Sequence, residues 1–135
     1  MAAMLTGMGM RHSSAARKLV YVSICTMLAA CSEPECGNQV KSETESPDKR
    51  LVATHFERNC GATTQFVQVV SIRPIGSLFD GNNTDEFVFT MQGNHEIDLH
   101  WMNASQLVIG RPSIRVDIFK ERESWRDISI QFVPL

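Results

Sequence analysis

Short apolar runs with a period of two recur from residue 51 to the end of the chain, and they constrain the fold more than any other feature. Apolar and polar side chains alternate in residues 97–101, 114–118 and 128–132. This spacing places the apolar side chains on one face of an extended strand, as in a half-buried sheet. Four further short apolar segments are also expected to be strands: residues 51–57, 65–72, 86–91 and 106–109.

Turn-forming Gly, Asn, Pro and Ser residues separate these seven segments. They occur at residues 59–61, 76, 81–83, 93–94, 103–105 and 110–112. Residues 120–126 are charged and short, so we expect a hairpin connection there, and no segment has a convincing helical period. Seven short strands at near-regular spacing predict an all-β domain, a small antiparallel meander folded as a sandwich or partly open barrel.

The first thirty residues have a different composition. Three bases and no acid occur in the first eighteen residues, and the uncharged run LVYVSICTMLAA follows at residues 19–30. A membrane-spanning helix needs roughly 20 apolar residues, so this shorter run is typical of a signal peptide instead. We therefore expect residues 1–30 to be a cleaved signal peptide, in which a start at Met10 would give the more typical length.

The segment Leu28-Ala29-Ala30-Cys31 ends this N-terminal region. An apolar residue three positions before a cysteine, with small residues beside it, is the pattern of a bacterial lipoprotein processing site. We therefore expect lipidation of Cys31 and, because Ser32 follows it, an outer-membrane anchor with the domain in the periplasm. Three acyl chains would anchor it stably. The alternative is an ordinary secretory signal, although Leu28 is larger than the residue that an A-x-A site prefers.

Cleavage before Cys31 would leave an acidic chain. It removes three of the 13 bases and none of the 15 acids, which leaves a net charge of −5. That charge disfavours nucleic acid as a partner and adhesion to lipid by charge alone. Residues 32–48 contain five acids and almost nothing apolar. We therefore expect residues 31–48 to be a lipidated cysteine and a solvated tether, and residues 49–135 to be the β domain.

The cysteines predict a disulfide. With Cys31 acylated, Cys36 and Cys60 remain as an even pair in an oxidising compartment, which favours a Cys36–Cys60 bond. Two free thiols, or one catalytic thiol, are the alternatives. A nucleophilic Cys60 would use His55 as its base, but no recognisable motif supplies the further histidine and carboxylate that would support thiol catalysis.

Three segments together resemble a known family. Residues 46–53 are SPDKRLVA, residues 56–64 are FERNCGATT, and residues 70–72 are VSI. They resemble a family of small, uncharacterised bacterial proteins, often found behind a lipoprotein signal, with the patterns SPDGK-x-x-A, F-x-R-[DN]-C-G-A-T-T and VSI. The resemblance is strong over residues 46–72 and looser beyond them, and it implies no established activity. Lys49 replaces the family's glycine, so the turn before the first strand is expected to differ.

Arg58, Gly61, Thr63 and Thr64 form the remaining candidate site. In one interpretation, Arg58 and the threonines hold the Cys60 turn by hydrogen bonds, and Gly61 supplies a positive φ. In the other, the four residues form a binding loop at one end of the sheet.

Two further patterns do not predict a metal site. His95 and His100 are five apart on an expected strand, so they point to opposite faces as exposed polar positions, whereas a zinc-protease helix places its histidines four apart. The acids at Asp80, Asp85 and Glu86 lack the order of ligands in an EF-hand, and a solvated hairpin loop is expected there. We expect neither a metal nor a cofactor.

These expectations favour a non-enzymatic, membrane-tethered interaction module of the cell envelope, with an envelope protein as its partner. The alternative is a small envelope enzyme, or an enzyme inhibitor that presents residues 58–64 to its target. A disulfide at Cys36 would leave only a short tether from Cys31. The Cys60 turn would then lie near the membrane, and the loops at residues 81–85 and 103–105 would face the periplasm.

Overall fold

The computed structural model describes residues 35–135, which form an all-β domain as predicted. The described part contains no helix, and therefore none that could span a membrane. The predictions for residues 1–30 and Cys31 lie outside the described residues. The strands are β1 (Gly37–Glu45), β2 (Leu51–Asn59), β3 (Val67–Pro74), β4 (Phe87–Gln92), β5 (Asp98–Asn103), β6 (Gln106–Arg111), β7 (Ile118–Glu121), β8 (Ser124–Trp125) and β9 (Ile128–Pro134).

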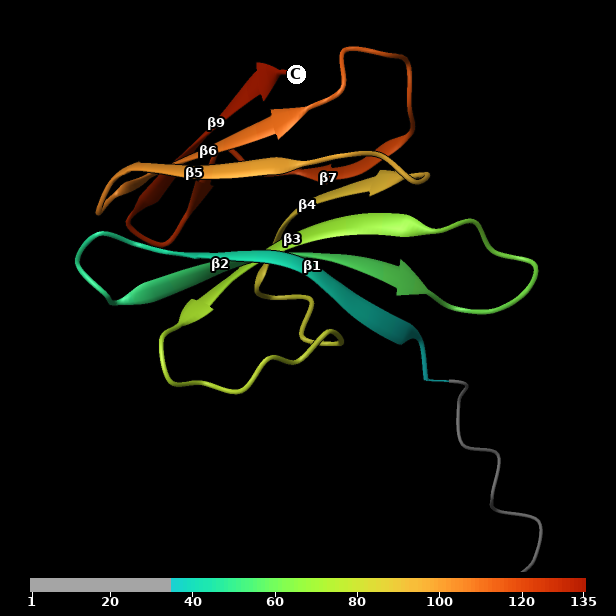
Figure 1. Ribbon diagram of the computed structural model, residues 1–135, viewed down its shortest axis with the longest axis horizontal. Helices are drawn as coiled ribbons and strands as arrows, with labels where there is room; N and C mark the ends of the chain where they lie inside the picture. Colours follow the sequence, from blue (N-terminus) through green and yellow to red (C-terminus); the bar gives the residue numbers. More distant parts are fainter. Residues whose placement is uncertain (1–34) are drawn as a thin grey trace, which may run out of the picture. The chain divides into compact units, whose positions relative to one another are not determined.

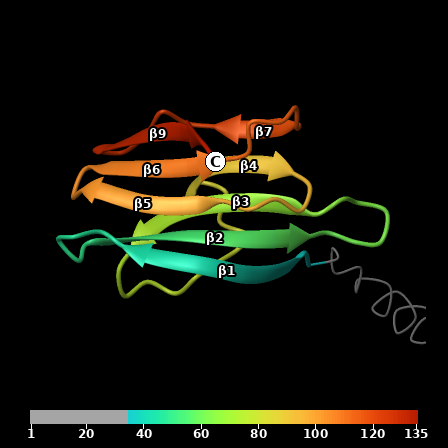
Figure 2. The ribbon, with the colours of Figure 1, turned by 45° about the horizontal axis from the view of Figure 1, so that its top comes forward.

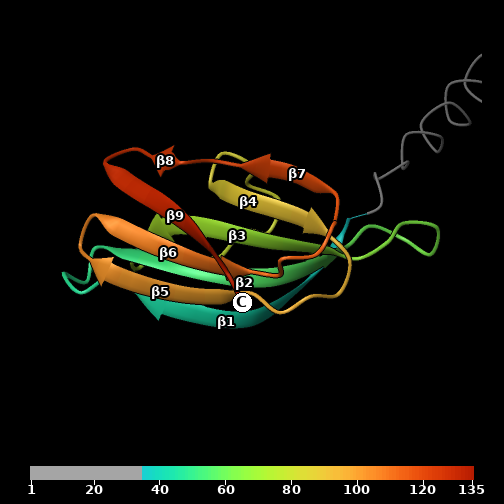
Figure 3. The same ribbon diagram turned by 90° about the horizontal axis from the view of Figure 1, so that it is seen from above.

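The strands form two sheets that face each other (Figure 1). The five-stranded sheet has the order β1-β2-β3-β4-β7, with every neighbouring pair antiparallel. The four-stranded sheet has the order β5-β6-β9-β8, in which only the β6–β9 pair is parallel. Figure 3, seen from above, shows the four-stranded sheet lying over the five-stranded sheet, and Figure 2 shows them from an intermediate angle. The architecture is therefore a β-sandwich, and the expected meander extends over β1 to β4.

One apolar core lies between the sheets. The five-stranded sheet contributes Ala53, Val70 and Phe89, and the four-stranded sheet contributes Leu107 and Ile109, all of them fully buried. Along β9 the core side chains Ile128, Ile130 and Phe132 are two residues apart, with exposed Ser129 and Gln131 between them, as a pleated strand requires. The period-two pattern of this segment therefore comes from burial against the opposite sheet.

Two buried tryptophans join the sheets along opposite edges of the four-stranded sheet. Trp101 on β5 donates from Nε1 to the backbone oxygen of Thr44 on β1, at 3.1 Å. Trp125 on β8 donates from Nε1 to the backbone oxygen of Asp85, before β4, also at 3.1 Å. Each indole thereby packs in the core and satisfies its one polar group.

Strand β1 occupies most of the segment that was expected to be a tether, so that prediction is wrong for Gly37–Glu45. The strand pairs with β2 along its whole length, from the Gly37–Asn59 pair to the Glu45–Val52 pair. It is an edge strand with most side chains exposed, so backbone hydrogen bonds hold it without an apolar pattern. Charged side chains on such an edge also disfavour pairing with other chains.

The predictions for the segment after β6 need a second correction. Residues 112–117 form a loop in place of the expected strand, and Ile114 is 57% exposed. The expected hairpin connection at residues 120–126 contains the end of β7 and all of β8. The alternation of branched apolar and polar residues favours an extended backbone. A strand also needs a neighbouring strand that takes up its backbone hydrogen bonds. Strand β4 ends at Gln92, whose backbone nitrogen donates to the oxygen of Asp117, so residues 112–116 lie beyond the end of β4.

The connection between β3 and β4, residues 75–86, covers the outer face of the five-stranded sheet. Phe79 packs edge-on against Phe56, with 5.0 Å between ring centroids, and Phe56 packs in the same way against Phe87 at 5.6 Å. These rings form a second, smaller apolar cluster. The connection joins the antiparallel neighbours β3 and β4, and Asp80 and Asp85 are exposed, so the predicted hairpin loop is confirmed. It is not solvated throughout, because Phe79 holds part of it against the sheet.

Gly81 in this connection lies against β1. A Cβ atom at Gly81 would lie 2.4 Å from Cγ of Asn38, so only glycine permits this close approach. Asn38 is two residues from Cys36. The expectation that residues 81–85 lie far from the Cys60 turn is therefore wrong for Gly81.

Candidate functional site

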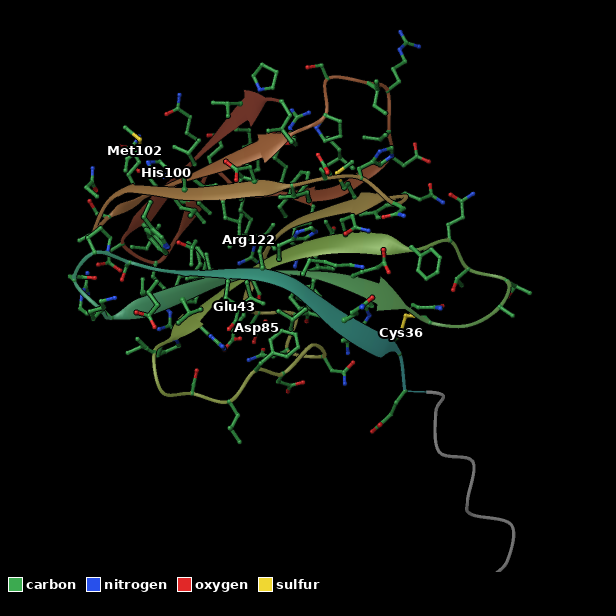
Figure 4. All side chains as sticks on the ribbon, in the orientation of Figure 1. Cys36, Glu43, Asp85, His100, Met102 and Arg122 are labelled. Atoms are coloured by element: carbon green, nitrogen blue, oxygen red, sulfur yellow. A yellow bond between two sulfur atoms is a disulfide. The ribbon has the colours of Figure 1, made fainter. Side chains whose placement is uncertain are left out.

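A disulfide joins Cys36 and Cys60, with the two sulfur atoms 2.11 Å apart, which confirms the predicted pair. The cysteines flank the Gly37–Asn59 pair that begins the β1–β2 ladder. Figure 4 shows Cys36 at this end of β1. While the bond is intact, Cys60 cannot act as a nucleophile with His55 as its base.

The residues around Cys60 make hydrogen bonds in two separate parts of the domain. Gly61 has a φ of 133°, and its backbone oxygen accepts hydrogen bonds from the backbone nitrogen (3.1 Å) and Oγ1 (2.9 Å) of Thr64. Thr63 is exposed. Arg58 donates from Nη1 to the backbone oxygen of Gly81. Thr64 therefore holds the turn as expected, whereas Arg58 fastens the β3–β4 connection and not the turn.

A cleft of about 610 Å³ opens between β1 and the segment that leads into β5. Its lining comes from several elements: Lys41 and Ser42 from β1, His55 from β2, Gln68 from β3, Asn94, His95, Glu96 and Ile97 from the β4–β5 segment, Asp98 from β5, and Leu135. A bulge in β1 between Val40 and Ser42 lets two consecutive residues line the cleft. Bulges redirect side chains in this way and are common beside functional sites.

His55 and Gln68 are the most deeply buried polar residues of the cleft, at 5% and 1% exposure. Nε2 of His55 lies 2.8 Å from Oε1 of Gln68. Nε2 of Gln68 donates to Oε2 of Glu57 and to the backbone oxygen of Gly93, each at 3.0 Å. Because these two oxygens can only accept, the orientation of the Gln68 amide is set, and its Oε1 must accept from His55. Neutral His55 therefore carries its proton on Nε2.

Burial lowers the pKa of His55 below its ordinary value. The hydrogen bond to Gln68 and the charge of Glu57 oppose this shift, and the charge of Lys41 adds to it. His55 is therefore neutral at pH 7, and its Nδ1 keeps a lone pair that can accept a hydrogen bond.

The cleft lining presents negative charge, because its one lysine is already paired with a carboxylate. Nζ of Lys41 lies 3.4 Å from a carboxylate oxygen of Glu57 and donates to Oε1 of Gln39 at 3.0 Å. Glu96 and Asp98 are exposed carboxylates in the lining. With the lysine already paired, these two acids and the acceptor nitrogen of His55 favour a ligand group that is positively charged and donates hydrogen bonds.

Gly93 allows His95 to pack beside it. Gly93 has a φ of 99°, and a Cβ atom there would lie 2.7 Å from Nε2 of His95. His95 is half-buried and lines the cleft, while His100 is exposed on β5 (Figure 4). The expectation that both are exposed strand positions is wrong for His95, because β5 begins only at Asp98.

Asp80 in the β3–β4 connection has a local structural role. Oδ1 of Asp80 accepts a hydrogen bond from the backbone nitrogen of Asn82 at 2.9 Å, which shapes the turn. Within residues 35–135, no three His, Cys, Asp or Glu side chains are arranged to hold a metal ion.

Sequence reasoning did not identify the cleft, although one signal was present. His55 lies two residues after Ala53 on β2, on the face of the strand that points to the core. Gln68 lies two residues before the core residue Val70 on β3. A polar side chain at an apolar phase of a strand is either paired or functional.

No protein-family model matches this sequence, and no significant similarity links it to a curated protein or a solved structure.

Proposed function

We propose that the chain is a membrane-anchored, non-enzymatic interaction module of the bacterial cell envelope, attached to lipid through Cys31 and facing the periplasm from the outer membrane. The disulfide between Cys36 and Cys60 carries this proposal. Structural disulfides persist in the periplasm and on cell surfaces and are rare in reducing compartments. A signal peptide over residues 1–30 would deliver the chain to such a compartment.

The cleft around His55 is our candidate for the partner site. It combines a buried acceptor, two exposed carboxylates and a lysine whose charge is already paired. A lysine or arginine side chain of an envelope protein fits this chemistry. Lys41 and Ser42 lie in the middle of β1, so the cleft is accessible from the side of the sandwich.

Metabolic labelling with a radiolabelled fatty acid tests the anchor. The wild-type chain and the matched control Cys25→Ala should take up label, because Cys25 lies within the signal peptide. Cys31→Ala should take up none and should remain unprocessed. Label retained by Cys31→Ala would overturn the anchor.

Site-specific photocrosslinking in whole envelopes tests the partner site. A photoreactive residue at Asn94, in the cleft, should capture a protein, and the same residue at Asn103, at the exposed end of β5, should not. Adding Asp98→Asn to the Asn94 probe should lower the yield by weakening attraction to a basic group. Equal capture from both positions, or no effect of Asp98→Asn, would contradict the proposed cleft chemistry.

A further inference from the structure

The strand registers align the ends of all five strands in a row at one end of the five-stranded sheet. Gly37 pairs with Asn59. Along the row, Arg58 beside Asn59 pairs with Val67, Val67 with Gln92, and Met91 with Ile118. This end therefore carries the disulfide and three loops, residues 60–66, 93–97 and 112–117. We call it the disulfide end.

The three loops adjoin one another. The backbone nitrogen of Gly93 donates to the oxygen of Phe66 at 2.8 Å, and that of Gln92 donates to the oxygen of Asp117 at 2.9 Å. Gln65, His95 and Arg115, one from each loop, line a common hollow of about 450 Å³. The loops therefore form one surface and not three independent projections.

This surface exposes apolar side chains. Phe66 is 44% exposed and Ile114 is 57% exposed, and Arg115 is exposed beside Ile114. Aromatic, branched apolar and arginine side chains are the types that enter the headgroup region of a membrane. Apolar exposure alone does not select this end, since Met102 near the opposite end is 59% exposed.

The number of residues between Cys31 and the disulfide determines which end of the sandwich lies near the membrane. Five residue steps separate Cys31 from Cys36, and these reach at most about 18 Å. Strand β1 is nine residues long, so the opposite end of the sheet lies roughly 30 Å farther away. In Figures 1, 2 and 3 the 60–66 loop lies at the same end as the start of β1.

We propose that the disulfide end of the sandwich lies on the lipid surface, with Phe66 and Ile114 in the headgroup region. This inference rests on the proposed anchoring through Cys31. The short tether keeps loops 60–66 and 112–117, which carry Phe66 and Ile114, at high effective concentration beside the bilayer, so weak apolar contacts suffice to orient the domain. Loop 93–97 lines the cleft, which opens beside β1 on the side of the sandwich. Met102 and the β5–β6 turn then lie away from the membrane.

The test uses the chain from Cys31 to Leu135, coupled chemically to a maleimide lipid in phosphatidylcholine–phosphatidylglycerol vesicles. Cys31 is the one free thiol of that chain while the disulfide is intact. Phe66→Trp, Ile114→Trp and the control Met102→Trp each place a fluorophore at an exposed position. Quenching by lipids brominated near the headgroup is measured relative to the parent, whose two tryptophans are buried.

Phe66→Trp and Ile114→Trp should be quenched and blue-shifted on coupling, and Met102→Trp should not. No quenching at the first two positions, or equal quenching at all three, would overturn the proposed orientation. Each variant should melt within a degree or two of the parent, since all three positions are exposed. Because the lipid is attached chemically in this experiment, a negative result contradicts only the proposed orientation. A failure of fatty-acid labelling in cells contradicts the proposed lipid anchor on Cys31.

Discussion

His55 and Gln68 are joined by a 2.8 Å hydrogen bond between Nε2 and Oε1, beneath the cleft. The histidine is nearly fully buried, and its pKa is lowered chiefly by that burial. The unfolded chain therefore binds a proton at a pH where the folded chain does not. The stabilisation from neutral His55 is complete above the unfolded pKa near 6.5 and is lost as the pH falls from there through the lowered folded pKa.

We predict that the free energy of unfolding is lower at pH 5.5 than at pH 7.5 and that His55→Gln reduces this difference. Urea unfolding at the two pH values measures it. Asp48 does not contribute in this range, because Ser46 and Arg50 hold its pKa at about 2. An unchanged pH dependence in His55→Gln would show that His55 is not the group responsible.

Gln68→Leu should lower the free energy of unfolding by about 2–4 kcal/mol. The substitution keeps the approximate size of a fully buried side chain but leaves the His55 N–H, a Glu57 oxygen and the Gly93 oxygen without their partner. His55→Leu combined with Gln68→Leu should cost less than the sum of the single changes, because it removes both ends of one bond. Additive costs in this double-mutant cycle would contradict the coupling.

Lys49→Gly should raise the free energy of unfolding by about 0.5 kcal/mol. Lys49 has a φ of 59°, which costs a residue with a side chain roughly 1–2 kcal/mol. Glycine relieves this strain. Part of the gain is offset by the larger unfolded-state entropy of glycine and by the loss of the exposed 2.6 Å ion pair between Lys49 and Glu45. Lys49→Ala is the matched control, since it loses the ion pair and keeps the strain. A gain in stability from the alanine would refute the backbone explanation.

The unreduced domain should contain no thiol that reacts with a maleimide once Cys31 is blocked. Replacing Cys36 and Cys60 with serine should lower the free energy of unfolding by about 3–4 kcal/mol, because the bond closes a loop with a sequence separation of 24. Maleimide mass tagging and urea unfolding check the two statements. Reaction at both cysteines in the folded, unreduced protein would contradict them.

The fold was predictable where burial imposes a pattern on the sequence. Strands β5 and β9 alternate because every second side chain meets the opposite sheet. Strand β1 was not predictable in this way, because an edge strand is held by its backbone and its side chains remain in solvent. Loop 112–117 shows the converse, since it has the alternation of a strand without a strand partner.

The candidate site was less predictable than the fold. Cys36 and Cys60 could be paired by counting cysteines. The cleft depends on contacts distant in the sequence, such as the bond from Gln68 to Gly93, 25 residues away. Arg58 likewise donates a hydrogen bond to the backbone oxygen of Gly81, which is 23 residues away. Such contacts follow from strand order and register, which local periodicity does not specify.

Mass spectrometry of the mature protein extracted from membranes tests the central claim most directly. We predict a chain whose first residue is Cys31, with a diacylglyceryl group on its sulfur and the Cys36–Cys60 disulfide intact. A mature chain that begins elsewhere, or that begins at Cys31 without lipid, would contradict it.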